Sequence, residues 1–243
     1  MNCSDVYNIF FKPGELTEIR AHGVKGNNKA WEGYAGSDGI VYGYFDNADD
    51  FGRCAEALDA AKAPGIYFVL NPIIPDLLAR ANNRLKAATR KSIATSDKDI
   101  LFIRWLYIDL DPIRPAGISS TDDELKKAIR LRNKIHKCFK DLGAKHCIPA
   151  MSGNGAHLMV KLKDTELTNR ESPSQDPRVI IIKNALNRLA EMFGTKDVDV
   201  DRSVYNPSRI CKVYGTAARK GDHIKIRPHR RSYIEPKFLE GRK

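Results

Sequence analysis

Several signatures of well-known enzyme classes are missing from this sequence. It has no Cys-x-x-Cys pair, no His-x-His pair and no Gly-x-x-x-x-Gly-Lys-Ser/Thr loop. The missing His-x-His pair argues against a nickase of the common type, and the missing glycine-rich loop argues against a fused helicase or ATPase within these residues. The five cysteines are scattered and odd in number, which favours reduced thiols over a disulfide framework.

Zinc-type ligand spacing and long apolar runs are also missing. His136, Cys138, His146 and Cys147 lie close together in the sequence, but their spacing does not match the usual structural zinc patterns. No apolar run approaches the length of a membrane span, and no secretory hydrophobic region opens the chain. We therefore expect a cytoplasmic protein without a membrane partner.

Negative charge is in short supply. The 243 residues hold 41 Lys and Arg against 30 Asp and Glu, which gives a formal net charge of +11. An excess of this size favours a polyanionic partner, and nucleic acid is the first candidate. The alternative is a positive surface that only keeps the protein in solution.

The first hundred residues predict an N-terminal α/β subdomain. Aromatic and glycine residues around a Ser-Asp-Gly turn signal predict a hairpin over residues 31–45. Asn47 is a suitable N-cap for an alanine-rich helix that reaches residue 61, and a short strand is expected over residues 66–70.

A basic helix is predicted next. Pro75 opens it, and Arg80, Arg84 and Lys91 recur along it at helical spacing. The resulting basic face is either solvated or in contact with DNA.

Residues 101–243 predict a second subdomain that ends in a basic segment over residues 219–231. Its hydrophobic periodicity predicts strands over 105–109, 146–151, 157–162 and 209–214, with helices over 121–142 and 177–193. This order, βαββαβ, is that of ferredoxin-like and RNA-recognition (RRM-like) folds. We expect an α+β protein in which both subdomains form one domain, with one face of the RRM-like sheet left open by the helices.

The strand predicted at residues 105–109 leads into two carboxylates. Successive side chains of a strand point to opposite faces, so Asp109 and Asp111 share one face while Ile108 and Leu110 occupy the other. Two neighbouring anions repel one another, and a divalent cation relieves that repulsion. We interpret the pair as half of a metal site; solvated turn residues are the alternative.

A second polar segment is a predicted turn followed by a histidine. The turn consists of Ser152, Gly153, Asn154 and Gly155, and it leads to His157 on the returning strand. Taken alone, this pattern fits a tight hairpin and a structural histidine as well as it fits a binding site.

A third polar segment comes late in the chain. Asp199 and Asp201 share one strand face if the segment is extended, so spacing alone cannot choose between them. Arg209 and Lys212 follow on the last predicted strand, and Lys220 lies in the basic segment. In a βαββαβ sheet all three polar segments lie on or beside the open face, where they can converge.

In this order the three segments resemble the motifs of the archaeo-eukaryotic primase superfamily. That family has an acidic pair after a hydrophobic strand, a serine and glycine turn before a histidine, and a third acid on a later strand. Within that superfamily the sequence resembles the primase-polymerases of plasmids, prophages and other mobile elements, including CRISPR-associated ones. Residues 206–216 also resemble the third block of the family, whose spacing favours Asp201 over Asp199.

The resemblance implies template-directed nucleotidyl transfer with Mg²⁺ or Mn²⁺ as the cofactor. The implied metal ligands and catalytic residues are Asp109, Asp111 and Asp201. The implied nucleotide-binding residues are Ser152, Gly153, Asn154, Gly155, His157, Arg209, Lys212 and Lys220. The implied partners are a single-stranded DNA template with its primer, ribo- or deoxynucleoside triphosphates, and a helicase or another replication or CRISPR protein.

A non-catalytic nucleic-acid-binding module on an RRM-like sheet is the main alternative. Such sheets usually present stacking aromatics on their central strands. Here the central strand presents Asp109 and Asp111, which would repel phosphates in the absence of a metal ion.

Overall fold

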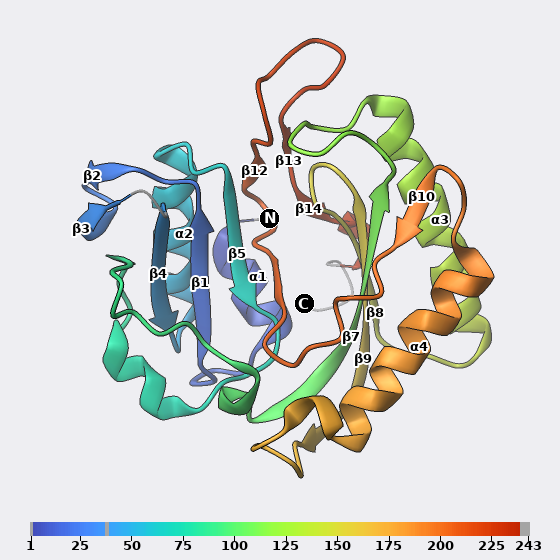
Figure 1. Cartoon of the computed structure of the whole chain (residues 1–243), viewed down its shortest axis with the longest axis horizontal. Helices are drawn as coiled ribbons and strands as arrows, with labels where there is room; N and C mark the ends of the chain where they lie inside the picture. The colour runs from blue at the N-terminus through green and yellow to red at the C-terminus, as the bar shows by residue number, and fades with distance from the viewer. Residues whose placement is uncertain (1, 37–38, 239–243) are drawn as a thin grey trace.

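The computed structural model describes residues 2–36 and 39–238 as a mixed α+β fold with two large sheets and a small ribbon (Figure 1). The seven-stranded sheet holds β1 (Thr17–His22), β2 (Gly26–Asn28), β3 (Trp31–Ala35), β4 (Ile40–Phe45), β5 (Gly65–Val69), β6 (Lys86–Ala87) and β11 (Ile210–Lys212). Their order across the sheet is β11-β5-β1-β4-β6-β3-β2.

Two helices, α1 (Cys3–Phe10) and α2 (Ala48–Ala60), cover one face of this sheet. The contact is aromatic: the ring centroid of Phe68 on β5 lies 5.2 Å from that of Phe10, 5.9 Å from Phe11 and 6.1 Å from Phe51. Short 3₁₀ turns, η1 (Pro75–Arg80) and η2 (Asp97–Asp99), lie in the connection to the second sheet.

Some of the predictions for this half are confirmed. The Asn47 side chain caps α2 by accepting the Asp50 amide, and the strand expected over residues 66–70 is β5. The hairpin over residues 31–45 is wrong as a pairing, because β6 lies between β3 and β4 in the sheet. Part of its predicted turn, residues 37–38, lies outside the described residues.

The basic helix predicted from Pro75 is also wrong beyond its first turns. Helical structure ends with η1 at Arg80, since Asn83 has a left-handed φ of +49° and its amide donates to the Tyr44 carbonyl. The chain then pairs with β4 as β6, so the three basic residues predicted to share a face do not lie on one helix.

The five-stranded sheet belongs to the second half of the chain. It holds β7 (Phe102–Pro112), β8 (Cys147–Met151), β9 (Ala156–Glu166), β10 (Val198–Val200) and β14 (Tyr233–Ile234), in the order β10-β7-β9-β8-β14. Two long helices, α3 (Asp122–Asp141) and α4 (Pro177–Phe193), connect its strands, together with η3 (Pro173–Gln175), and η4 (Pro236–Phe238) follows β14.

The predicted βαββαβ order is confirmed. The elements β7, α3, β8, β9, α4 and β10 follow one another, and the neighbours β10-β7, β7-β9 and β9-β8 are all antiparallel. Thr121 forms the capping box that starts α3, and Asp176 caps α4. Both helices lie on the side of the sheet that faces away from the seven-stranded sheet (Figure 1).

The last strand of this sheet differs from the prediction. Residues 209–214 are predicted to complete the RRM-like sheet, but β10 completes it, with Val198 and Val200 buried. Residues 210–212 form β11 instead, and β11 pairs with β5 of the other sheet. The chain therefore crosses between the two sheets after β10, and this crossing brings Arg209 and Lys212 opposite β7.

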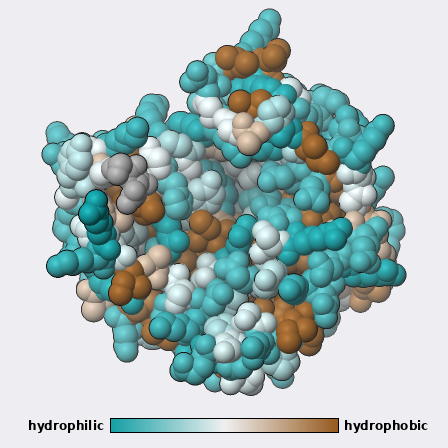
Figure 2. Space-filling view, viewed as in Figure 1, coloured by the Kyte–Doolittle hydropathy of each residue, from teal (hydrophilic) through white to brown (hydrophobic). Residues whose placement is uncertain are grey.

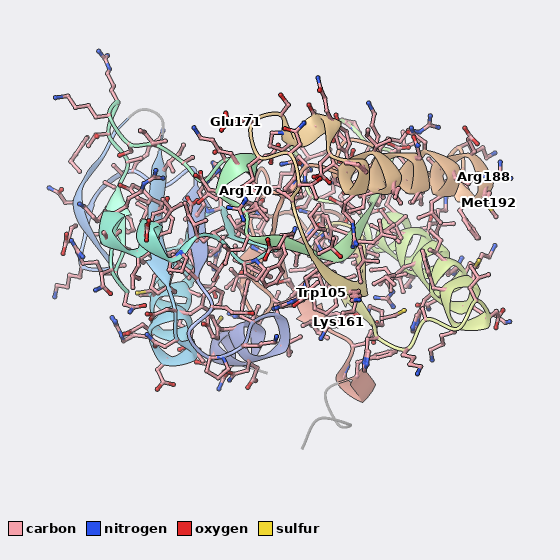
Figure 3. The ribbon with its side chains drawn as sticks, turned by 90° about the horizontal axis from the view of Figure 1, so that it is seen from below. Trp105, Lys161, Arg170, Glu171, Arg188 and Met192 are labelled. Carbon is pink, nitrogen blue, oxygen red and sulfur yellow. The ribbon has the colours of Figure 1, made fainter. Side chains whose placement is uncertain are left out.

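A buried arginine links the two halves. Arg104 on β7 is 3% exposed; its guanidinium lies 2.6 Å from the Glu15 carboxylate and 2.9 Å from that of Asp164 on β9, and it donates to the Phe10 carbonyl. Beside it, the ring of Trp105 contacts Phe10 at 5.3 Å. Lys161 lies over the same Trp105 ring, as Figure 3 shows.

The ribbon of β12 (Ala217–Ala218) and β13 (Arg230–Arg231) carries a loop that projects from the molecule (Figure 1). Asp59 of α2 anchors its base by pairing with Arg219 and Arg231, each at 2.9 Å. Hydrophobic atoms are visible on the projecting segment (Figure 2), where Ile224 and Ile226 are exposed. None of the helices described is long and apolar enough to cross a membrane.

Candidate active site

A cavity of about 280 Å³ lies where the end of β7 meets β5 and β11. Both halves of the chain line it. The lining residues are Tyr67, Tyr107, Asp109, Asp111, Arg114, Ser152, Asn154, His157, Arg209, Ile210, Lys212, Ala218 and Lys220.

An ion pair forms the inner wall of the cavity. His157 Nε2 lies 3.4 Å from Asp109 Oδ1 and 3.0 Å from the Tyr107 hydroxyl, and Nδ1 lies 2.7 Å from the Tyr214 hydroxyl. Burial by itself would lower the pKa of His157, but the Asp109 carboxylate outweighs burial and raises that pKa to about 10. Burial would raise the pKa of Asp109, yet His157 and Arg209 lower it. Asp109 is therefore ionised at neutral pH.

Asp111 is the less compensated of the two carboxylates. Partial burial and the charge of Asp109 raise its pKa, and the Arg114 guanidinium, 3.6 Å away, opposes this shift. A divalent cation relieves such like-charge repulsion, and oxygen ligands are those that Mg²⁺ and Mn²⁺ prefer. Mg²⁺ is usually held by one or two carboxylates together with substrate phosphates. The donor set therefore fits a hard divalent cation.

The third predicted carboxylate lies beside the pair but outside the cavity lining. The Asp201 amide donates to the Asp109 carbonyl at 2.9 Å, and its carboxylate lies 3.6 Å from Arg209. Asp199 is the direct cross-strand neighbour of Asp111, so these two side chains share a face. The register thus keeps both candidates next to β7.

Within residues 2–36 and 39–238, no three His, Cys, Asp or Glu side chains form a group that could hold a metal ion. This covers the cluster of His136, Cys138, His146 and Cys147 as well as the three predicted carboxylates. The role of Asp201 as a metal ligand stays a prediction.

The predicted glycine turn lies at the edge of the cavity. Its backbone amides are engaged within the protein: the Gly155 amide donates to Ser152 Oγ at 3.0 Å, and the Gly153 amide lies 2.8 Å from the Met151 sulfur. Asn154 Oδ1 accepts the Ser120 amide at 3.0 Å.

Both glycines allow the turn to approach neighbouring strands closely, because a side chain at either position would collide with them. A Cβ on Gly155 would lie 2.6 Å from the Leu110 carbonyl oxygen and 2.8 Å from Asp111 Oδ1. Gly153 has a φ of +108°, and a Cβ there would lie 2.4 Å from the Ala218 Cβ. The turn therefore packs directly on the end of β7 and on β12.

Basic side chains face the carboxylates from the opposite wall. Lys212 is 3% exposed, its Nζ donates to the Ala217 carbonyl at 2.9 Å, and burial lowers its pKa to about 7. Arg209 and Lys220 line the same cavity. The structure thus brings together in one cavity lining every predicted nucleotide-binding residue except Gly153 and Gly155.

The chain was compared with protein families, curated proteins and solved structures. No protein family model matches the chain, and no curated protein matches it. Among the solved structures that are similar to this chain is the polymerase domain from Mycobacterium tuberculosis Ligase D in complex with DNA, at 14% identity and a TM-score of 0.47, over 98% of this chain and 85% of that chain.

The three basic residues predicted as a DNA-binding face lie elsewhere. Arg80 donates to the Tyr44 hydroxyl and the Ile93 carbonyl, Arg84 pairs with Glu32 at 3.0 Å, and Lys91 is exposed in a loop. None of the three lines the cavity.

Five lining residues are not among the predicted site residues, and three of them, Tyr107, Arg114 and Tyr67, have polar side chains; the other two are Ile210 and Ala218. Tyr107 had a usable signal, because it is two residues before Asp109 on the same strand face. Arg114 follows Asp111 closely in sequence, but its return toward the carboxylate depends on the loop after β7. Tyr67 carried no signal, since β5 belongs to the other sheet.

Proposed function

We propose that this chain is a DNA primase-polymerase of the archaeo-eukaryotic primase type, which joins nucleotides on a single-stranded DNA template. The observation that carries this proposal is one cavity in which an acidic pair, Asp109 and Asp111, faces the basic residues Arg209, Lys212 and Lys220. Nucleotidyl transfer needs this combination, because a triphosphate must be held by positive charge next to the group that activates the attacking hydroxyl.

Each part of the cavity has a distinct task in this proposal. Asp109 and Asp111, with Asp201 beside them, would hold Mg²⁺ or Mn²⁺. A bound ion of this kind favours the deprotonated 3′-hydroxyl and neutralises the leaving pyrophosphate. His157 keeps Asp109 ionised and fixes its orientation through the 3.4 Å contact, and its direct contact with the triphosphate stays a prediction.

In this proposal the basic residues that face the carboxylates bind the phosphates of the nucleotide. Arg209 and Lys220 contribute positive charge, and Lys212 can gain or lose a proton near neutral pH because burial lowers its pKa to about 7. An incoming triphosphate stabilises the charged form of Lys212, so nucleotide binding and protonation are coupled there.

The biological setting is proposed from the sequence motifs. We propose a mobile element or a defence-associated replication system, in which a helicase or a CRISPR protein works beside the polymerase. Ribo- and deoxynucleoside triphosphates are both candidate substrates.

The test is incorporation of labelled nucleotides on single-stranded DNA, with and without a primer, in Mg²⁺ or Mn²⁺. We expect Asp109→Asn/Asp111→Asn to lower incorporation on the order of 10³-fold or more, since charge is removed without a change of shape. Asp123→Asn, an exposed aspartate of α3 that pairs with Lys127, is the matched control and should leave the rate unchanged. Incorporation that survives in the double variant would refute the assignment of the site.

A catalytically idle nucleic-acid-binding module is the second candidate. It is favoured by one observation, that no third acidic or histidine ligand completes a metal cluster among the described residues. Template binding by the wild-type protein without incorporation under any of these conditions would support this alternative.

A further inference from the structure

A row of alternating basic and aromatic side chains crosses the seven-stranded sheet from the cavity outward. In order across β11, β5, β1, β4 and β6, its members are Lys212, Tyr67, Arg20, Tyr42 and Lys86, each the direct cross-strand partner of the next. Directly opposed residues of antiparallel strands point to the same face. With strands about 4.8 Å apart, the row spans roughly 19 Å.

The row lies on the face that the helices leave open. Ile19, Val41 and Phe68 alternate with its members along the strands and are fully buried on the side of α1 and α2. In Figure 1 the open face is turned toward the viewer, with α2 behind the sheet. The members of the row that lie on β5, β1, β4 and β6 are partly exposed.

The row joins two cavities. Lys212 and Tyr67 line the candidate active site, whereas Arg20 and Tyr42 line a second cavity of about 270 Å³. The other wall of the second cavity is the loop of residues 88–94, which includes Arg90 and Ile93. The loop of residues 88–94 thus borders the open face of the sheet beside Arg20 and Tyr42.

Local contacts hold the row in position. The Tyr67 ring lies over Gly65, because a Cβ added to Gly65 would lie 2.6 Å from the Tyr67 hydroxyl. The Lys212 Nζ lies 5.6 Å from the centroid of the same ring. Arg20 is fixed by Glu18 through two hydrogen bonds of 2.9 and 2.8 Å. These constraints keep an aromatic ring and a planar guanidinium at fixed places on the sheet.

The acidic groups of the seven-stranded sheet that lie next to the row are compensated. Glu18 is 1% exposed and engaged by Arg20, and Glu32, the next residue in register after Lys86, pairs with Arg84 at 3.0 Å. Lys86 and Lys212 form no ion pair with a described residue. The row therefore presents net positive charge to a ligand.

We propose that this row is the path by which a single-stranded nucleic acid reaches the cavity. Alternating aromatic and basic groups suit this ligand, because bases stack on aromatic rings and guanidinium planes while the backbone is neutralised by cations. The identification of that strand as the template rests on the proposed function, whereas the binding surface itself does not.

The test is the affinity for a fluorescein-labelled single-stranded oligodeoxynucleotide, measured by anisotropy in EDTA and without nucleotide. We expect Tyr42→Leu to weaken binding about tenfold and Tyr42→Phe, which keeps the ring, to bind like the wild type. Lys86→Ala should weaken binding and reduce the slope of log K against log salt by about 1.

Matched controls come from the other half of the chain. Tyr233→Leu on β14 and Lys134→Ala on the exposed side of α3 remove the same residue types away from the row and should leave affinity unchanged. Thermal unfolding of each variant, compared with the wild type, excludes a folding defect as the cause of weaker binding.

The outcomes separate this inference from the proposed function. If the row variants bind as tightly as the wild type, or the wild type binds no single strand, the path is refuted even where incorporation is observed. If the row variants lose affinity but the wild type incorporates no nucleotide, the path stands and the polymerase proposal fails.

Discussion

The two large sheets make unlike contributions to one cavity. The five-stranded sheet supplies negative charge and its buried counter-ion, Asp109, Asp111 and His157, whereas the seven-stranded sheet supplies Tyr67 and Lys212. The segment after β10 crosses from the first sheet to the second and carries Arg209 with it. Neither sheet alone places basic side chains beside the carboxylate pair, so the proposed activity would require the junction between them.

The largest expected effect on stability is at that junction. Arg104→Met removes a buried guanidinium that pairs with Glu15 at 2.6 Å and Asp164 at 2.9 Å, and leaves both carboxylates without their main partner. We expect the free energy of unfolding to fall by about 3 kcal/mol. Denaturant unfolding monitored by tryptophan fluorescence measures this change, since Trp105 is the next residue.

An exposed arginine pair provides the control for this prediction. Arg188 and Glu191 lie 3.4 Å apart near the end of α4, where Figure 3 labels Arg188, and both are mostly exposed. Arg188→Met should change stability by less than about 0.5 kcal/mol. Equal effects of the two substitutions would mean that Arg104 does not join the halves.

The next prediction separates the two walls of the cavity by their response to pH. The pKa of His157 is raised from 6.5 to about 10 in the folded protein, so its ion pair stabilises fully below pH 6.5 and this stabilisation is lost as pH rises toward 10. The pKa of Lys212 is lowered from 10.5 to about 7 in the folded protein. Above pH 10.5 the burial of the neutral amine does not lower the free energy of unfolding through protonation. As pH falls from 10.5 to 7, the unfolded chain gains the proton first, so the folded state is progressively destabilised.

Between pH 7 and 10 the two side chains therefore contribute opposite slopes. Relative to the wild type, His157→Gln should be most destabilised at pH 7 and recover toward pH 10. Lys212→Met should gain most at pH 7, with changes on the order of 2–3 kcal/mol across the window for each variant. Urea midpoints measured at four pH values test this, and slopes of the same sign would contradict the assignment of charge to the two walls.

The elements of the second half could be read from the sequence because their signals are local. Thr121 and Asp176 are side-chain caps, and the apolar periodicity of α3 and α4 follows the face that each helix buries. Strand alternation likewise predicts that Asp109 and Asp111 share a face, whereas the site role of His157 follows from the resemblance; in the structure His157 lies directly opposite Asp109.

The remaining features depend on contacts between distant segments, which local patterns do not encode. Residues 210–212 do form a strand, as predicted, but only the tertiary structure decides that β11 pairs with β5. The placement of Tyr67 opposite Asp109 follows from that pairing. The spacing of basic residues from Arg80 to Lys91 is helical, yet this segment forms β6, which pairs with β4.

The smallest expected effect concerns a contact between the glycine turn and the ribbon that follows β11. A Cβ on Gly153 would lie 2.4 Å from the Ala218 Cβ, and its φ of +108° disfavours any side chain. We expect Gly153→Ala to cost about 2 kcal/mol, part from the backbone and part from the clash. Gly143→Ala, at a φ of +85° with no atom within 4 Å, isolates the backbone part at about 1 kcal/mol.

A second substitution distinguishes the two parts at Gly153 itself. Ala218→Gly removes the atom that the new Cβ would meet, so Gly153→Ala/Ala218→Gly should recover the share of the loss due to the clash and leave the backbone share. Unfolding free energies of the two single variants and the double variant form a cycle that measures this coupling. Strict additivity would mean that turn and ribbon do not touch, and that the glycine serves only the tight turn.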